Sequence, residues 1–358
     1  MSKQTISEVV RLLEEDGLIR ETGRTSGHVG RSAVTYELVP EAAFVGAVDL
    51  GGTKLRVALV DLVGRILAEA VEPTVKTGGA AVTAQIGRLV RQVAAQAGVD
   101  FARVRLLVAG CPGVPDADSG SVQFAPNIPG LDTMDVRGAL GAELGVEVVL
   151  ENDVNLAVLG EHWIGCGAGL DQLAYVALGT GIGAGLIVNG ALLRGAGGAA
   201  GELGYLPFGA DPFEPESLRV GALERVVATQ GIRDHYRRLT GQERSVPDIF
   251  SAAETGEAAA QEVLRATART LARAVAAIAA ISNPEMVIIG GSIGARPSLI
   301  AALRRELAAC FPAPPRIEPS PLGNHAALAG AAAVGLTHLH TALFAQGVPG
   351  GAIALPAA

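Results

Sequence analysis

The sequence is poor in cysteine, aromatic residues and positive charge. Its three cysteines, Cys111, Cys166 and Cys310, are far apart and odd in number, which predicts free thiols in a reducing cytoplasm. The formal net charge of -8 excludes a global attraction to nucleic acid, so any contact with DNA requires a local basic patch. The charged N-terminus does not resemble a signal peptide, and we expect no run of about 18 apolar residues without charges. The expected location is cytoplasmic.

Apolar residues are abundant and make up 49% of the chain. That share supplies a large core, which excludes an intrinsically disordered protein. The chain of 358 residues is long enough for two domains and a small appendage.

The most informative segment is AVDLGGTKLRVALVD, residues 47–61, which predicts two apolar strands joined by a glycine turn. Adjacent glycines let a backbone approach a ligand closely, because no Cβ is in the way. An acidic residue before the turn can hold hydrated Mg²⁺, and a hydroxyl and an ammonium after it can contact phosphate oxygens. The residues concerned are Asp49, Gly51, Gly52, Thr53 and Lys54. They predict a nucleoside triphosphate site, although a plain hairpin turn is an alternative for this segment alone.

Two more glycine turns follow along the chain. Residues 173–190 repeat the strand–turn–strand design, and their turn contains Gly179, Thr180, Gly181 and Gly183. A third glycine pair, Gly290 and Gly291, lies between an apolar strand and a helical pattern, where backbone N–H groups can face a ligand. We expect the first two turns to be two halves of one enclosing site. An ordinary strand-to-helix turn is the alternative for the third pair.

A polar triplet, Glu151, Asn152 and Asp153, separates an apolar strand from a helical pattern. The carboxyl ends of strands are where α/β proteins bind ligands. Asp153 could accept a hydroxyl proton, and Asn152 could bind a neighbouring hydroxyl. Simple capping of the helix N-terminus is the alternative.

Residues 1–40 predict a helix followed by two short strands, as in the second half of a winged helix-turn-helix. The start of the helix is polar at Lys3, Gln4 and Thr5, as a major-groove reader requires. Arg24 and Arg31 lie toward a glycine-rich wing tip that could contact phosphates. A helix and hairpin that only pad the first domain are the alternative. Because no supporting helix precedes this one, we expect weak or no binding of DNA.

Taken together, the motifs resemble the ROK family of repressors, uncharacterised reading frames and sugar kinases. DLGGTK and GTGIGAGLIVNG are similar to its two phosphate motifs, and VIIGGSIG to its adenosine segment. ENDVNLAVLGE is similar to the stretch that holds the sugar and the catalytic aspartate. Residues 110–130 resemble its sugar-side loop.

This resemblance implies an α/β fold with two actin/hexokinase-like (ribonuclease H-like) lobes and ligands between them. The expected units are residues 1–40, a small lobe of 41–155 plus about 325–346, and a large lobe of 156–324. Asp153 would act as the base that deprotonates a sugar hydroxyl. The sugar would be bound by Asn127, Asn152, Asp153, Glu202, Tyr205 and Glu224.

One segment departs from the family pattern. The histidine of the family's GExGH segment is replaced by Tyr205, and the last cysteine of its zinc loop by Ala222. The segment between them contains no cysteine. Zinc needs about four Cys, His or carboxylate ligands at close spacing, so we expect no structural zinc. Sugar specificity should also differ from that of the kinases.

The sequence predicts a regulator first, with a kinase as the alternative. The fused N-terminal segment favours a sugar-responsive transcriptional regulator that binds operator DNA in a full-length form. The intact phosphate motifs and Asp153 favour an ATP- and Mg²⁺-dependent kinase of a hexose or amino sugar. The two are compatible, and a binding scaffold with neither activity is a third option. The resemblance implies a homodimer or homotetramer.

Overall fold

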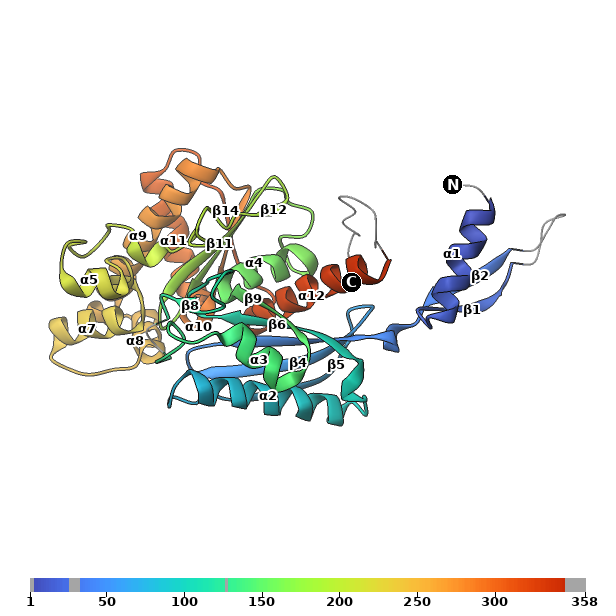
Figure 1. Cartoon of the computed structure of the whole chain (residues 1–358). Helices are drawn as coiled ribbons and strands as arrows, with labels where there is room; N and C mark the ends of the chain where they lie inside the picture. Colours follow the sequence, from blue (N-terminus) through green and yellow to red (C-terminus); the bar gives the residue numbers. More distant parts are fainter. Residues whose placement is uncertain (1–2, 26–32, 126–127, 345–358) are drawn as a thin grey trace.

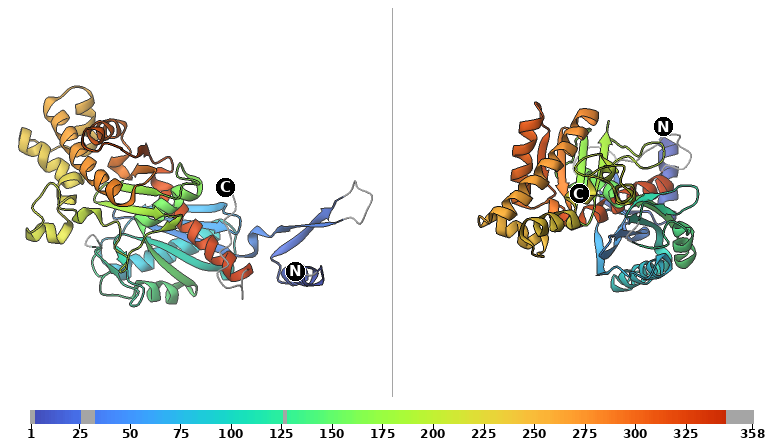
Figure 2. Two further views of the ribbon diagram at one scale, coloured as in Figure 1. Left: turned by 90° about the horizontal axis from the view of Figure 1, so that it is seen from above. Right: turned by 90° about the vertical axis from the view of Figure 1, so that its left-hand side faces the viewer.

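The computed structural model describes residues 3–25, 33–125 and 128–344. The N-terminal segment is a helix and an antiparallel hairpin that stand away from the body of the molecule (Figures 1 and 2). Its elements are α1 (Lys3–Glu15), β1 (Ile19–Arg24) and β2 (Val34–Leu38), followed by η1 (Pro40–Ala42). On α1 the apolar side chains of Ile6 and Val9 are exposed. Elements α1, β1 and β2 are the helix and two strands that the sequence predicts for this segment.

The first lobe is built on a five-stranded sheet of order β5-β4-β3-β6-β9. The first three strands form an antiparallel meander, and β6 and β9 add to β3 in parallel. Every residue of β3 is buried, as a continuous apolar run predicts. The elements of this lobe are β3 (Phe44–Leu50), β4 (Lys54–Asp61), β5 (Ile66–Pro73), α2 (Gly79–Gln96), η2 (Phe101–Arg103), β6 (Val104–Cys111), β7 (Val114–Pro115), β8 (Val122–Gln123), α3 (Val136–Leu144) and β9 (Glu147–Asn152).

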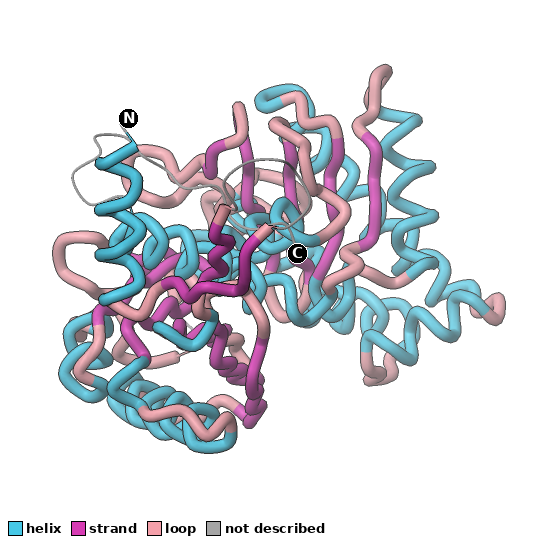
Figure 3. The backbone as a smooth tube through the Cα atoms, turned by 90° about the vertical axis from the view of Figure 1, so that its right-hand side faces the viewer, coloured by secondary structure: helices cyan, strands magenta, loops and turns pink. Residues whose placement is uncertain are grey.

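The second lobe repeats this topology in the order β12-β11-β10-β13-β14. Its strands run side by side, next to the helices of the lobe (Figure 3). The strands are β10 (Leu173–Leu178), β11 (Ile182–Val188), β12 (Ala191–Leu192), β13 (Met286–Gly290) and β14 (Arg316–Pro319). The helices are η3 (Leu203–Tyr205), α5 (Pro215–Val220), α6 (Glu224–Val227), α7 (Thr229–Thr240), α8 (Val246–Glu254), α9 (Ala258–Ser282), α10 (Gly291–Gly294), α11 (Pro297–Cys310) and η4 (Gly323–His325). The two-lobed α/β architecture implied by the resemblance is confirmed.

Two helices join the lobes, α4 (Asp153–Ile164) and α12 (Ala326–Phe344) (Figure 1). Helix α12 packs on β3 and β6, whereas α4 packs on β10 and β11. Both belong to one buried apolar cluster with residues of both sheets. The stretch Gly323–Phe344 is long and apolar enough to cross a membrane, and 56% of its apolar window is buried inside the fold, as in a core helix. The expectation that no such uncharged stretch exists is therefore wrong, because residues 323–344 contain no Asp, Glu, Lys or Arg.

Glycines allow α4 and α12 to cross at close range. A Cβ on Gly330 would lie 1.8 Å from the carbonyl oxygen of Leu156, and one on Gly160 would lie 2.2 Å from that of Ala326. Neither backbone atom can move without separating the helices. The crossing therefore fixes how α4, and with it the end of β9, is placed between the lobes.

We predict that Gly330→Ala lowers the free energy of unfolding by about 2 kcal/mol or more, because the added methyl group forces the helices apart. Urea unfolding measures the change. Gly141→Ala in α3 is the matched control, since its Cβ would lie 3.6 Å from the nearest atom, an ordinary contact. Alanine also favours the helix, so the control should be at least as stable as the parent. Equal stability of the two variants would contradict the close crossing.

Candidate active site between the lobes

The carboxyl ends of the parallel strands of both sheets meet at a cavity of about 330 Å³, called here the interlobe cavity. The first glycine turn reaches it from between β3 and β4, and the second from between β10 and β11. The predicted site residues that line it are Gly51, Gly52, Thr53, Asn152, Asp153, Gly179, Thr180, Gly181, Gly183, Glu202, Tyr205, Glu224 and Gly291. Segments far apart in the sequence are thus brought to one place.

Three of the predicted residues do not line the interlobe cavity. Asp49 is buried, and its Oδ2 lies 3.5 Å from Nη1 of Arg56 on the neighbouring strand. Lys54 is exposed at the start of β4, and Gly290 ends β13 just before the cavity-lining Gly291. Asn127 lies outside the described residues.

The first glycine turn is held by side chains that follow β5. The Oγ1 of Thr74 donates a hydrogen bond of 2.7 Å to the carbonyl of Gly51, and Nζ of Lys76 donates to the carbonyl of Gly52. A Cβ on Gly51 would lie 2.9 Å from the carbonyl oxygen of Lys54, so the tight bend requires glycine there. Lys76 thus supplies an ammonium group beside the turn, a position that the sequence had suggested for Lys54.

The second glycine turn is anchored by a carboxylate of the large lobe. Glu224 Oε2 accepts the backbone N–H of Ile182 at 3.0 Å, and a Cβ on Gly181 would lie 2.6 Å from that oxygen. Thr229 donates through both its backbone N–H and its Oγ1 to the carbonyl of Gly179, at 3.0 and 2.9 Å. In the structure Glu224, which the resemblance predicts to bind sugar, fixes the shape of this turn.

Asn152 caps the N-terminus of α4. Its Oδ1 accepts the N–H groups of Val154 and Asn155 at 2.9 and 3.0 Å, and its Nδ2 donates to the carbonyl of Gly113 at 2.9 Å. The capping alternative therefore holds for Asn152, although the residue also lines the interlobe cavity. An amide carries two N–H donors, so one remains for a ligand.

Asp153, the first residue of α4, is partly buried at the wall of the interlobe cavity. Burial raises its pKa to about 7, and the nearby charges of Asp49 and Glu202 add to this effect. Burial also raises the pKa of Asp49 to about 6, against the opposing influence of Arg56. A carboxylate with a pKa near neutrality can accept and release a proton at cellular pH.

Glu151 holds the junction between β9 and α4 through hydrogen bonds, a role that the sequence did not indicate. Its carboxylate is buried, and Oε1 accepts the backbone N–H of Asn152 at 3.0 Å and Nδ2 of Asn155 at 2.9 Å. Its Oε2 accepts Nε of Arg194 at 2.8 Å. Arg194 lies 43 positions further along the chain, so no local pattern could have identified this pair.

The remaining wall of the cavity combines an acid with aromatic rings. The Tyr205 hydroxyl donates to the carbonyl of Arg219 at 3.4 Å, and its ring meets that of Phe124 edge-on with 5.9 Å between centroids. Phe124, with φ of 55°, lines the cavity and was missed from the sequence. Burial raises the pKa of Glu202 beside them. Aromatic rings next to a carboxylate suit a ligand with both C–H faces and hydroxyl groups.

The loop that carries zinc ligands in the family is held by ion pairs in this chain. Arg225 Nη1 lies 2.5 Å from Glu214 Oε2 and donates to Oγ of the buried Ser217 at 2.6 Å. Ala222 is buried and has no donor atom. Within the described ranges, no group of three or more His, Cys, Asp and Glu side chains could hold a metal ion. The donors of this loop therefore do not fit zinc.

The residues proposed to contact DNA lie on the projecting N-terminal segment. Gln4 and Thr5 are exposed on α1, which also contains Lys3. Arg24 is exposed on β1, with its Nε 3.6 Å from Glu21 Oε1. Arg31 lies outside the described residues. Part of the positive charge of the wing is therefore balanced within the hairpin itself.

We predict that Asp153→Asn stabilises the protein at pH 8 but not at pH 4. The folded-state pKa of about 7 exceeds the ordinary value of 3.8, so ionisation penalises the folded state increasingly as the pH rises between these values. Asparagine does not titrate, so the advantage of the variant should grow across this window and then stay constant. Urea unfolding at several pH values measures it.

Asp116→Asn is the control with the opposite sign. Hydrogen bonds from Ser119 hold the pKa of Asp116 below its usual value, so its carboxylate favours the folded state once ionised. This variant should not gain stability at pH 8. A pH-independent effect of Asp153→Asn would contradict the raised pKa.

Comparison with known proteins places this architecture in a family. The ROK family model matches residues 45–337. The chain is 33% identical over 318 residues to a glucokinase of Thermotoga maritima, covering 83% of the chain and 98% of that protein. A ROK family glucokinase from Streptomyces griseus, solved with glucose and AMPPNP, is 26% identical with a TM-score of 0.69 and covers 82% and 99% of the two chains.

A further likeness includes the N-terminal segment. A ROK family transcriptional regulator, described as a homolog of the Escherichia coli MLC protein, has a TM-score of 0.77 and 24% identity, covering 97% of this chain and 91% of its own. That identity shows a common fold alone. With the family match over most of its length, this chain belongs to the ROK family.

Proposed function

We propose that this protein is an ATP-dependent sugar kinase, with the sugar and the triphosphate meeting in the interlobe cavity. One observation supports this above the others. Asp153, with its pKa near neutrality, lines the same cavity as the two glycine turns. A base and two phosphate cradles on facing lobes are the parts that phosphoryl transfer to a hydroxyl requires.

In the proposed reaction, Asp153 accepts the proton of the sugar hydroxyl as that oxygen attacks the γ-phosphorus. The bond from the γ-phosphorus to the β,γ-bridging oxygen breaks, and ADP leaves with that oxygen. Backbone N–H groups of the glycine turns and the hydroxyls of Thr53 and Thr180 would bind phosphate oxygens, with Lys76 beside the first turn. Mg²⁺ usually enters such sites with the nucleotide, where it neutralises phosphate charge.

Asp49 is not well placed to bind Mg²⁺ directly, because its carboxylate is buried against Arg56. Its charge instead helps to raise the pKa of Asp153. We therefore assign Asp49 an electrostatic role in place of the direct metal contact suggested by the sequence.

The proposed acceptor is a hexose or an amino sugar. Glu202 and the remaining N–H of Asn152 would bind its hydroxyls, and the rings of Phe124 and Tyr205 would cover its apolar face. The glucokinase names of the relatives and the glucose bound to the Streptomyces griseus protein support this class. AMPPNP in the same complex supports ATP as the phosphate donor.

The first test is sugar-dependent ADP formation across a panel of hexoses and amino sugars. Asp153→Asn should lower kcat about a thousandfold or more, since it removes the base but keeps the size of the side chain. For the parent, kcat/KM should rise with pH through about 7, as Asp153 loses its proton. Asp171→Asn, before β10, is the control and should leave turnover unchanged. Turnover that Asp153→Asn does not reduce would exclude Asp153 as the base.

A second test separates the two lysines near the first glycine turn. Lys76→Met should raise the KM for ATP about tenfold, because an ammonium beside the phosphates is lost. Lys54→Met is the matched control and should change this KM less than about twofold, since the side chain of Lys54 is exposed and, unlike that of Lys76, has no hydrogen bond to the turn among the described residues. The reverse ranking would show that the sequence had identified the correct lysine.

Sugar-responsive transcriptional regulation is the second candidate, favoured by the projecting helix and strands of residues 3–25 and 33–38. The fold likeness to a ROK family regulator includes this segment. A change in lobe angle on sugar binding would move two such segments in a homodimer or homotetramer relative to one another. A regulator without kinase activity predicts sugar binding by calorimetry with no ADP formed.

A further inference from the structure

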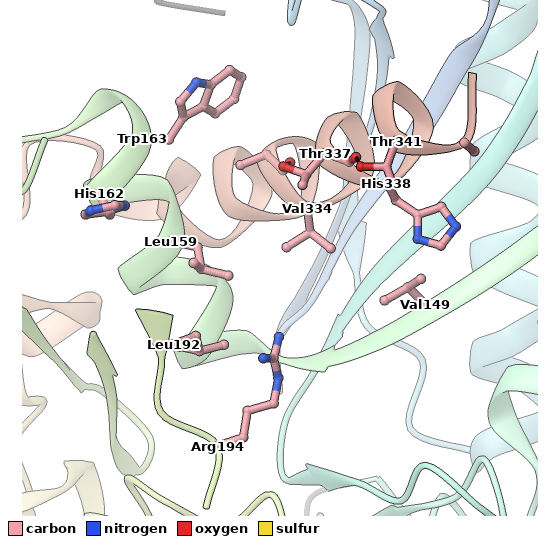
Figure 4. Close-up of a pocket in the computed structure, with 12 residues that line it drawn as sticks. Val149, Leu159, His162, Trp163, Leu192, Arg194, Val334, Thr337, His338 and Thr341 are labelled. Atoms are coloured by element: carbon pink, nitrogen blue, oxygen red, sulfur yellow. Dashed lines mark hydrogen bonds between the residues drawn. The ribbon is translucent and has the colours of Figure 1, made fainter. Parts of the chain in front are cut away.

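A larger cavity is lined by residues of α4 and α12 and shares no lining residue with the interlobe cavity. This outer groove, of about 820 Å³, is bounded by β9, α4, α12 and the segment after β12 (Figure 4). Leu159 of α4, Val149 of β9 and Val334 of α12 provide apolar walls, and Val334 points toward the middle. Its volume lies in the range of small-molecule sites, about 300–1,000 Å³. None of the proposed kinase residues lines it.

The polar groups of the outer groove are basic or neutral. Arg194, His162 and His338 line it, and none of the described residues lining it is acidic. Arg194 uses Nε and Nη2 for Glu151, at 2.8 and 2.7 Å, while its Nη1 has no hydrogen-bond partner among the residues that the structure describes. His338 Nε2 lies 3.0 Å from Glu147 Oε1. An apolar space with an available guanidinium N–H edge favours an anionic ligand with an apolar body.

We propose that the outer groove binds a small amphipathic carboxylate, whose chain lies between α4 and α12 and whose carboxylate is bound by Arg194. Apolar walls with a few polar groups are typical of small-molecule sites. The guanidinium can donate to an anion from the edge that contains Nη1, while Nε and Nη2 keep their contacts with Glu151. The outer groove offers one guanidinium edge beside short apolar walls. These features match a ligand with one charged end and a short apolar chain better than a helix or a second protein.

The outer groove is connected to the active site by one ion pair. Arg194 binds Oε2 of Glu151, whose Oε1 holds the backbone N–H of Asn152, the residue before Asp153. Glu151 is buried, so weakening its contact with Arg194 leaves a poorly compensated charge behind the start of α4. An anion on the second edge of Arg194 shares the positive charge of the guanidinium, and so weakens its attraction for Glu151 without breaking the hydrogen bonds between them. This coupling, which rests on the proposed function, should weaken binding of sugar.

Binding is tested without any assay of catalysis. The fluorescent probe 1-anilinonaphthalene-8-sulfonate combines an apolar body with one negative charge, and its emission rises in apolar sites. Octanoate should displace it, whereas 1-octanol, of the same chain length, should displace it at least about tenfold more weakly because it has no charge for Arg194.

Two variants and one control identify the site. Arg194→Met should weaken octanoate about tenfold by removing the charged hydrogen bonds. Val334→Trp keeps Arg194 but fills the outer groove, and should abolish displaceable fluorescence even if Arg194→Met proves unstable. Arg265→Met on α9 is the matched control, since Arg265 is exposed and pairs only with Glu262 among the described residues. It should bind octanoate like the parent.

Several outcomes would overturn the proposal. These are equal displacement by octanoate and 1-octanol, unchanged binding in Val334→Trp, or a sedimentation result in which a dimer of this chain covers the groove and dissociates when residue 334 is changed.

The coupling between the outer groove and the sugar site is tested separately. Octanoate should raise the KM or Kd for the sugar about fivefold in the parent but not in Arg194→Met. If octanoate binds without this effect, the site stands and the coupling is wrong; if no sugar binds at all, the proposed function fails and the probe assay still decides the site.

Discussion

The close crossing of α4 and α12 is the constraint on which the rest of the structure depends. At Gly160 and Gly330 the two backbones leave no room for a Cβ. Because α12 packs on the first sheet and α4 on the second, the crossing connects the two lobes directly. Asn152 caps α4, and the crossing fixes the position in space of this helix, whose first residue is Asp153. A packing contact in the centre of the molecule thus determines the position of the proposed base.

The electrostatics of the interlobe cavity follow from this placement. Asp153 is enclosed at a helix N-terminus, where the helix dipole favours a negative charge, yet burial and nearby carboxylates oppose ionisation more strongly. Asp49 and Glu202 show the same rise in pKa for the same main reason. The ionised carboxylates therefore lower the free energy of unfolding, and the site contains a carboxylate that can take up a proton near neutral pH.

Much of the fold and part of the site could be predicted from the sequence, and the division has a physical basis. Glycine turns between apolar strands are local patterns, so the sequence could indicate the turns at 51–53 and 179–181, and both line the interlobe cavity. Lys76 and Arg194 act on residues far along the chain, and only the strand order brings them there. Lys54 was preferred because it is adjacent in sequence, but it starts a strand, and the ammonium group bonded to the turn is that of Lys76. Asn152 was ambiguous because the same amide can cap a helix and face a ligand.

The two sheets have the same strand order, so the two glycine turns occupy equivalent positions in two copies of one supersecondary unit. In each copy the turn offers main-chain N–H groups, and main-chain groups do not depend on the identity of the side chains around them. Divergence can therefore replace the side chains proposed to contact sugar, remove a metal loop or add an N-terminal segment while the proposed phosphate cradle persists. A main-chain cradle within a wall of exchangeable side chains is compatible with the 33% identity between this chain and the Thermotoga maritima glucokinase.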